Sequence, residues 1–201
     1  TDASAAFAEK LGAWLDFRNA ITLHGIHSAP ASHRSTRQPE TLQDALNAEL
    51  ARRRSVLTAS IQLPLPGLDL SLKPATAYEP YRRHHLARQR EMELQLRQLR
   101  NKIRSLLSGV SPSLQKLAAL DAAFEHMLSE RESKLFSTVP ALLEKHFKQM
   151  LKEHAQDDPP HWLRTFGTTL QSALLSELEV RLQPALGLIE AYNDEMKIRH
   201  D

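Results

Sequence analysis

Apolar residues recur along this chain at helical spacing, because positions three, four and seven residues apart share one face of an α-helix. Four such residues predict a first helix over about 4–17: Phe7, Leu11, Trp14 and Leu15. A second helix is expected from Thr41, whose hydroxyl and the Asp44 carboxylate resemble a capping box at the first turn. Its predicted buried face carries Leu42, Ala45, Leu46, Leu50 and Leu57.

The most regular pattern lies in the middle of the chain. Five apolar residues follow one another at steps of 4, 3, 4 and 3, as in a coiled-coil seam: Met92, Leu96, Leu99, Ile103 and Leu106. Gly109 suits a helix end, Ser111 a cap for the next helix, and Pro112 its first turn. We therefore predict an antiparallel helical hairpin over about 81–136. Its returning helix is expected to bury Leu114, Leu117, Leu120, Phe124, Met127, Leu128 and Leu135.

The remaining pattern predicts further helices within 140–198. Ser137, Thr138 and Pro140 mark a break, after which a stripe continues to about residue 155 with Leu142, Leu143, Phe147, Met150 and Leu151. Pro159 suits the first turn of a last long helix, and Pro184 is expected to kink or interrupt it. The stripe of this helix is Trp162, Phe166, Leu170, Leu174, Leu178 and Leu182, with Leu188, Ile189 and Tyr192 beyond the proline.

Two segments do not follow a helical period. Residues 18–40 combine three histidines with proline, glycine and serine, which predicts an irregular loop. Residues 61–80 are rich in proline and leucine, and Ile61, Leu63 and Leu65 alternate before Pro66 and Gly67. This second segment is either a small hairpin or an extended arm. No internal repeat is visible, so we expect one helical domain over 1–201.

Composition agrees with helices. Leucine occurs 34 times, against 4 valines and 6 isoleucines; leucine suits helices, whereas β-branched residues favour sheets. The fold class is therefore all-α, a helical bundle. No apolar run reaches the roughly 18 residues of a membrane span. The chain starts without Met or a basic and apolar leader. We therefore expect a trimmed piece of a cytoplasmic protein.

Candidate chemistry is sparse. There is no cysteine, none of the ten histidines follows a glutamate by three residues, and His-Glu-x-x-His is absent. His24, His27 and His33 form a local cluster, which we interpret as loop histidines rather than a metal site. His84 and His85 are expected at the surface, since they point about 100° apart. No glycine-rich phosphate loop and no Gly-x-Ser-x-Gly motif is present. Ser113 and Lys116 match Ser-x-x-Lys, but the companion motifs of that enzyme class are missing. We therefore expect no enzyme, no cofactor and no metal.

The charge pattern offers one candidate surface. Residues 1–110 carry 16 Lys/Arg and 10 Asp/Glu, while 111–201 carry 10 and 14. Arg83, Arg90, Arg97 and Arg104 repeat every seven residues and are expected as an outer row about 31 Å long. Such a row could follow a phosphate backbone. The interpretation we favour is a solvated face, or a face paired with the acidic second half of the chain.

The segment from Phe7 through Trp14 to Leu23 (FAEKLGAWLDFRNAITL) resembles the start of a bacterial family called domain of unknown function 3348. The arginine-rich helix and the hairpin at Pro112 are similar to it too. The resemblance implies a match over most of the chain, with an additional N-terminal segment in the family. Because the family has no assigned activity, it implies no functional residues, and Trp14 is interpreted as a core anchor or, if exposed, a docking residue.

These patterns predict a non-enzymatic scaffold or adaptor that acts through protein–protein contacts. Its partner is unknown, and a homodimer through the hairpin or the 61–72 arm is the expected mode. The alternative is a nucleic-acid-binding helical protein that uses the arginine row. The interaction residues are Arg83, Arg90, Arg97, Arg104, Met92, Leu96, Leu99, Ile103 and Trp14.

Overall fold

The computed structural model describes residues 39–65, 77–154 and 159–200. These residues form five helices: α3 (Pro39–Ile61), α4 (Glu79–Leu107), α5 (Pro112–Phe136), α6 (Val139–Glu153) and α7 (Pro159–His200). The described ranges contain no strand. The all-α prediction is confirmed. The described residues divide into two compact units, one with Arg104–Glu130 and the other with the described residues before Arg104 and after Glu130.

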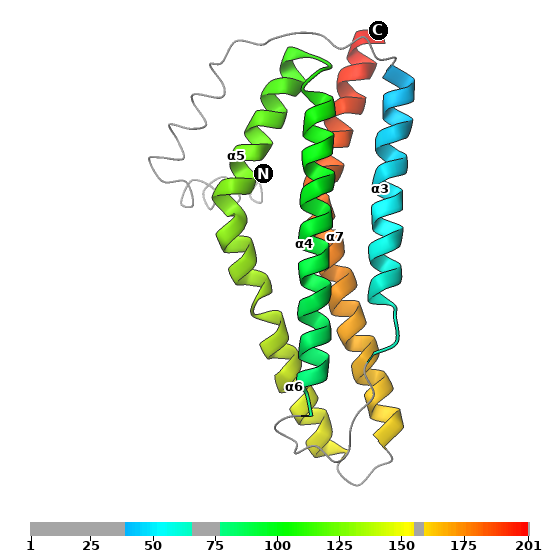
Figure 1. Ribbon diagram of the computed structural model, residues 1–201, viewed down its shortest axis with the longest axis vertical. Helices are drawn as coiled ribbons and strands as arrows, with labels where there is room; N and C mark the ends of the chain where they lie inside the picture. Colours follow the sequence, from blue (N-terminus) through cyan, green and yellow to red (C-terminus); the bar gives the residue numbers. More distant parts are fainter. Residues whose placement is uncertain (1–38, 66–76, 155–158, 201) are drawn as a thin grey trace, which may run out of the picture. The chain divides into compact units, whose positions relative to one another are not determined.

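Four helices pack as a bundle in the unit that contains α3, most of α4, α6 and α7. Within it α3 packs along α7, and α6 also packs against α7, as Figure 1 shows. Polar side chains join α3 to α4: the Ser60 hydroxyl lies 2.7 Å from the Glu91 carboxylate, and Arg53 donates to Gln95 at 3.3 Å. The Lys102 ammonium lies 3.3 Å from the Glu49 carboxylate.

The core of this unit follows the predicted stripes closely. All nine predicted stripe residues of α7 are at most 3% exposed: Trp162, Phe166, Leu170, Leu174, Leu178, Leu182, Leu188, Ile189 and Tyr192. α7 continues through Pro184, so the proline does not interrupt the helix. An aromatic cluster joins the start of α4 to α6 and α7, with ring centroids of Tyr81 and Phe166 5.4 Å apart and of Phe147 and Phe166 5.0 Å apart.

The unit that contains Arg104–Glu130 comprises the last turn of α4, a short turn and most of α5. Ser111 caps α5 as predicted, since its Oγ accepts a hydrogen bond from the Leu114 backbone N–H at 3.2 Å. Arg104 reaches from α4 to the carboxylates of Asp121 (2.9 Å) and Glu125 (2.6 Å) on α5. The end of α4 and the first half of α5 therefore lie side by side within this unit.

Several local predictions were wrong. α3 begins at Pro39, so Thr41 lies inside its first turn rather than at the N-cap, because the fixed φ of proline already suits that turn. Leu106 is only partly buried and Leu107 is fully buried. From Tyr81 to Leu107 the eight buried positions of α4 fall at steps averaging about 3.7 residues, the repeat of an almost straight helix rather than the 3.5 of a heptad seam.

Two leucines expected in the core are instead exposed: Leu135 and Leu142, each 64% exposed. Phe136 and Leu143, their neighbours in sequence, are buried. The spacing predicted the buried face of each helix to within about one residue. Packing at the break between α5 and α6 then buried Phe136 and Leu143 in place of Leu135 and Leu142. The predicted helix over 4–17, with Trp14, lies outside the described residues, as do most of the segments 18–40 and 61–80.

Candidate functional site

The break between α5 and α6 comes from Pro140. Proline has no backbone N–H, so the carbonyl four residues earlier, that of Phe136, has no helical donor. The structure supplies one from another helix, because Gln89 Nε2 on α4 donates to the Phe136 carbonyl at 3.2 Å. The Tyr78 hydroxyl donates to the carbonyl of Pro140 itself at 2.8 Å. Two side chains before and within α4 thus fix the backbone of the α5–α6 junction.

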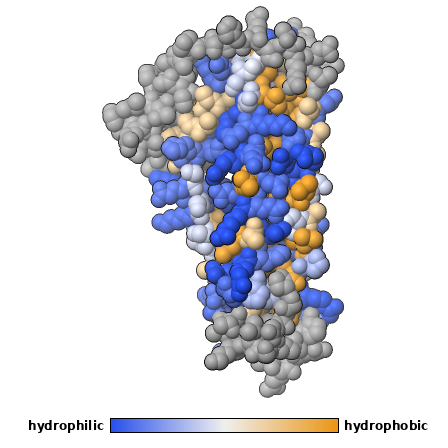
Figure 2. Space-filling view, viewed as in Figure 1, coloured by the Kyte–Doolittle hydropathy of each residue, from blue (hydrophilic) through white to orange (hydrophobic). Residues whose placement is uncertain are grey.

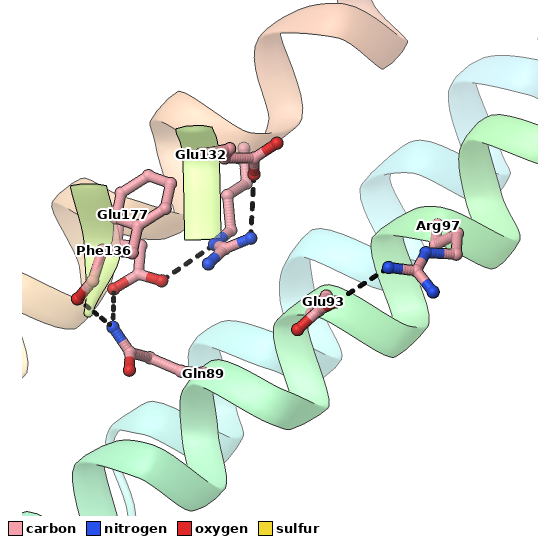
Figure 3. A network of polar contacts seen from close by, with 7 residues as sticks. Gln89, Glu93, Arg97, Glu132, Phe136 and Glu177 are labelled. Atoms are coloured by element: carbon pink, nitrogen blue, oxygen red, sulfur yellow. Dashed lines mark hydrogen bonds and ion pairs between the residues drawn. The ribbon is translucent and has the colours of Figure 1, made fainter. Parts of the chain in front are cut away.

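The Gln89 amide also belongs to a network of charged side chains, drawn in Figure 3, of which Glu177 and Arg181 are largely buried and Glu132 is 42% exposed. Gln89 Nε2 also donates to Glu177 Oε2 on α7 at 2.8 Å. Arg181 Nε donates to Glu177 Oε1 at 2.8 Å, and its Nη1 to Glu132 Oε1 at 2.8 Å. The Arg181 guanidinium also lies 4.1 Å from the centre of the Phe136 ring, a cation–π contact. α4, the end of α5 and α7 therefore meet in one network.

Burial makes this network costly to disturb. The side chains of Glu177 and Arg181 are only 3% and 10% exposed, and a buried charge that loses its partner is strongly unfavourable. Each carboxylate oxygen of Glu177 already accepts a hydrogen bond. The network therefore has the character of a structural clamp that ties α4, the end of α5 and α7 together at the junction.

Two tyrosines complete the surroundings of the junction. Burial, with a smaller contribution from Glu144, raises the pKa of Tyr78 to about 12, so its hydroxyl keeps the proton that it donates to Pro140. Burial also raises the pKa of Tyr81. Both rings pack against Phe147 of α6 at 5.4–5.6 Å between centroids. Aromatic contacts therefore fix the buried face of α6, and the opposite face of this helix is exposed.

The adjacent histidines on α4 do not lie where the sequence placed them. His85 is fully buried and His84 partly so, because the fully buried stripe of α4 passes through position 85. Neither ring nitrogen of His85 has a hydrogen-bond partner among the described residues. Burial, with a smaller effect of His84, lowers the pKa of His85 to about 4. Burial and the neighbouring Arg88 also lower the pKa of His84.

The predicted arginine row is only partly at the surface. Arg83 and Arg97 are exposed and form ion pairs with Glu79 (3.3 Å) and Glu93 (2.8 Å) on their own helix. Arg90 is exposed and has no ion pair in the described part of the chain. Hydrophilic side chains gather over α4 in Figure 2. Arg104 was predicted at the outer surface wrongly: its side chain is 11% exposed, because α5 carries two carboxylates opposite it.

The four apolar interaction residues of α4 are core residues. Met92, Leu96, Leu99 and Ile103 are between 0% and 7% exposed, so within this chain they are already covered. Trp14 and the histidines at 24, 27 and 33 lie outside the described residues. Among residues 39–65, 77–154 and 159–200, no group of three or more metal-ligating side chains comes together.

Sequence reasoning missed the network at the junction. One signal is the predicted break at Pro140, because the missing N–H of this proline implies another donor for the Phe136 carbonyl. A second lay in α7, where Glu177 and Arg181 are four residues apart and fall on the 3.6-residue continuation of the stripe through Leu170 and Leu174. A charged pair within an apolar stripe indicates a buried ion pair.

The fold and the junction define a helical-bundle protein with a polar clamp between α4, the end of α5 and α7. The chain belongs to the family described as protein of unknown function DUF3348, which matches residues 1–194. Neither curated proteins nor solved structures give a match to the chain. None of the helices in the described ranges is long and apolar enough to cross a membrane.

Proposed function

We propose that this chain is a non-enzymatic, cytoplasmic helical scaffold or adaptor that acts through contacts with other proteins. The cytoplasmic location is the expectation from the sequence. One observation carries the role in protein contacts: Leu135 and Leu142, each 64% exposed, lie beside the clamped α5–α6 junction. Single exposed apolar residues are ordinary on protein surfaces. Two leucines next to one rigid junction are a better candidate for a contact surface.

The clamp supports the same proposal. Binding costs less when the groups that make contact are already held in place. Gln89, Tyr78 and Arg181 hold the junction from the inside through hydrogen bonds of 2.8–3.2 Å and a contact with the Phe136 ring. A junction fixed in this way can present its outer side chains with little loss of conformational entropy on binding.

A photoreactive amino acid placed singly at Leu94, Leu135, Leu142 or Val180 tests this proposal in the native host. All four positions are between 58% and 64% exposed. We expect discrete adducts with protein at one or more of them, resistant to nuclease, and none at the exposed control position Ser172. Absence of adducts at all four positions would contradict the proposal. A homodimer would give adducts of twice the chain mass and a light-scattering mass that rises with concentration.

One observation supports the alternative, nucleic-acid binding through α4: Arg90 is exposed and has no ion pair in the described part of the chain. This alternative requires the pairs of Arg83 and Arg97 to open, which costs little for exposed ion pairs. It predicts binding to DNA or RNA that weakens with salt and with Arg90→Glu and Arg97→Glu. The scaffold proposal predicts no saturable binding at physiological salt by fluorescence anisotropy.

A further inference from the structure

The outer face of the α5–α6 junction combines exposed leucines with cationic side chains. Leu135 and Leu142 lie at its centre, each 64% exposed, with Thr138 and Ala141 also exposed. Arg131 and Lys134 lie before them in the sequence, and Lys145 and Lys148 after them, all exposed. This set, residues 131–148 on the outer side, is called the junction face below.

The residues of the junction face are aligned because the chain keeps its helical course through the break. Thr138 has φ −79° and ψ −25°, the right-handed helical region. The Leu135 carbonyl accepts from the Thr138 backbone N–H at 3.2 Å, and the Thr138 carbonyl accepts from the Leu142 N–H at 3.2 Å. α6 therefore continues onward from the end of α5, as seen in Figure 1. At the usual helical rise, residues 131–148 span about 25 Å.

The junction face carries several basic side chains, whereas the second half of the chain is acidic overall. Residues 111–201 carry 14 Asp/Glu and 10 Lys/Arg, yet four of those ten cations lie on the junction face. Lys134 and Lys145 are exposed and form no ion pair in the described ranges. Lys148 pairs only with Glu144 of its own helix, at 2.6 Å, with half its side chain exposed. Lys134 before the two leucines and Lys145 after them are therefore the cations that this face offers to a partner.

The geometry points to an acidic amphipathic helix of another protein as the occupant of the junction face, which rests on the proposed role in protein contacts. Leucines of the partner helix would cover Leu135 and Leu142, and carboxylates near its ends would meet the lysines at both ends of the face. An anionic membrane has the same charge. It suits the face less, because the opposite side of α6 is committed to the core through Leu143, Phe147 and Met150, leaving only a narrow apolar strip.

Peptide probes test the proposed chemistry on the full chain. The first is a 20-residue helical peptide with two leucines seven residues apart and glutamates near both ends; in the second, lysines replace the glutamates; in the third, serines replace the leucines. By fluorescence anisotropy, we expect the acidic peptide to bind at least 10-fold more tightly than either of the others. Equal binding of the three peptides, or binding of none, would overturn the inference.

Substitutions with a matched control test whether the acidic peptide binds at the junction face. Lys134→Glu with Lys145→Glu should reverse the preference, so that the lysine peptide binds more tightly than the acidic one. Leu135→Ser with Leu142→Ser should weaken the acidic peptide at least 10-fold. Val180→Ser, the loss of an equally exposed apolar residue elsewhere, should change nothing. Since all substituted positions are exposed, circular dichroism should show unchanged helix content and unfolding.

Further outcomes distinguish a protein partner from a membrane, and failure of this inference from failure of the proposed adaptor role. Stronger binding to vesicles with anionic headgroups than to the acidic peptide would overturn the inference in favour of a membrane. Nuclease-resistant protein adducts at Leu135 or Leu142 in the host, together with no preference for the acidic peptide, would overturn the inference while leaving the adaptor role supported. Absence of adducts at every tested position would overturn both.

Discussion

Replacing His85 with leucine should make the protein more stable, because this histidine occupies a core position without polar partners. It is fully buried, and neither ring nitrogen has a hydrogen-bond partner among the described residues. A buried polar group without partners costs about 1–3 kcal/mol. Leucine has a similar volume and no polar atom. We therefore expect His85→Leu to raise the free energy of unfolding at pH 7 by about 1–3 kcal/mol.

The pH dependence gives this prediction a second, independent part. The pKa of His85 is lowered from 6.5 to about 4 by folding, chiefly through burial. The unfolded chain therefore takes up this proton first, so the contribution of His85 falls as the pH drops from about 6.5 to about 4. At 1.36 kcal/mol per pKa unit the loss amounts to about 3 kcal/mol. The advantage of His85→Leu over the natural chain should grow by that amount between pH 7 and pH 4.

Urea unfolding followed by circular dichroism at pH 7, 6, 5 and 4 measures both parts. His126→Leu, at an exposed position on α5, is the matched control and should shift the free energy of unfolding by no more than about 0.5 kcal/mol at any pH. The reasoning is refuted if His85→Leu is less stable than the natural chain at pH 7. It is equally refuted if the difference between the two proteins stays constant down to pH 4.

Three other predictions concern ion pairs and a helix cap, each measured by urea unfolding. Glu177→Leu removes the buried carboxylate that pairs with Arg181 and leaves this guanidinium only Glu132, which is 42% exposed, so it should lower the free energy of unfolding by about 3 kcal/mol, the low end for a broken buried pair. Adding Arg181→Met should recover most of this loss, and a double variant as unstable as the single one would contradict the clamp. Burial alone would raise the pKa of Glu49, but hydrogen bonds from basic residues, chiefly on its own helix, lower it to about 2. Glu49→Gln should therefore lower the free energy of unfolding by about 1 kcal/mol at pH 7. This difference between the variant and the natural chain should disappear as the pH falls from about 4.5 to about 2, because Glu49 loses its charge. A difference that persists at pH 2 would show that the charge of Glu49 is not its cause. Ser111→Ala removes the cap of α5 and should cost about 1 kcal/mol, whereas Ser113→Ala, at an exposed neighbour, should be close to neutral.

Much of the fold follows from local spacing alone. The ends of α5 at Pro112 and Phe136, the break before α6 and the start of α7 at Pro159 agree with the sequence prediction. Proline and serine act through the backbone of their own turn, so no distant contact is needed to place these ends. The leucine stripe of α7 is similarly determined, since a stripe repeated over six turns leaves one face to bury.

The candidate site depended on contacts between distant residues. Gln89 meets the Phe136 carbonyl across 47 positions and Glu177 across 88, and no local pattern names such partners. Contacts between distant residues also determine which side chains point outward at the junction. Periodicity assigns a face only to within about one residue, and the packing of Phe136 and Leu143 turned Leu135 and Leu142 to the surface. The sequence determined where helices form and which stripe each buries, because those are properties of neighbouring residues. The tertiary structure decided which polar groups are clamped inside and which apolar ones are exposed, because both depend on what another helix places opposite them.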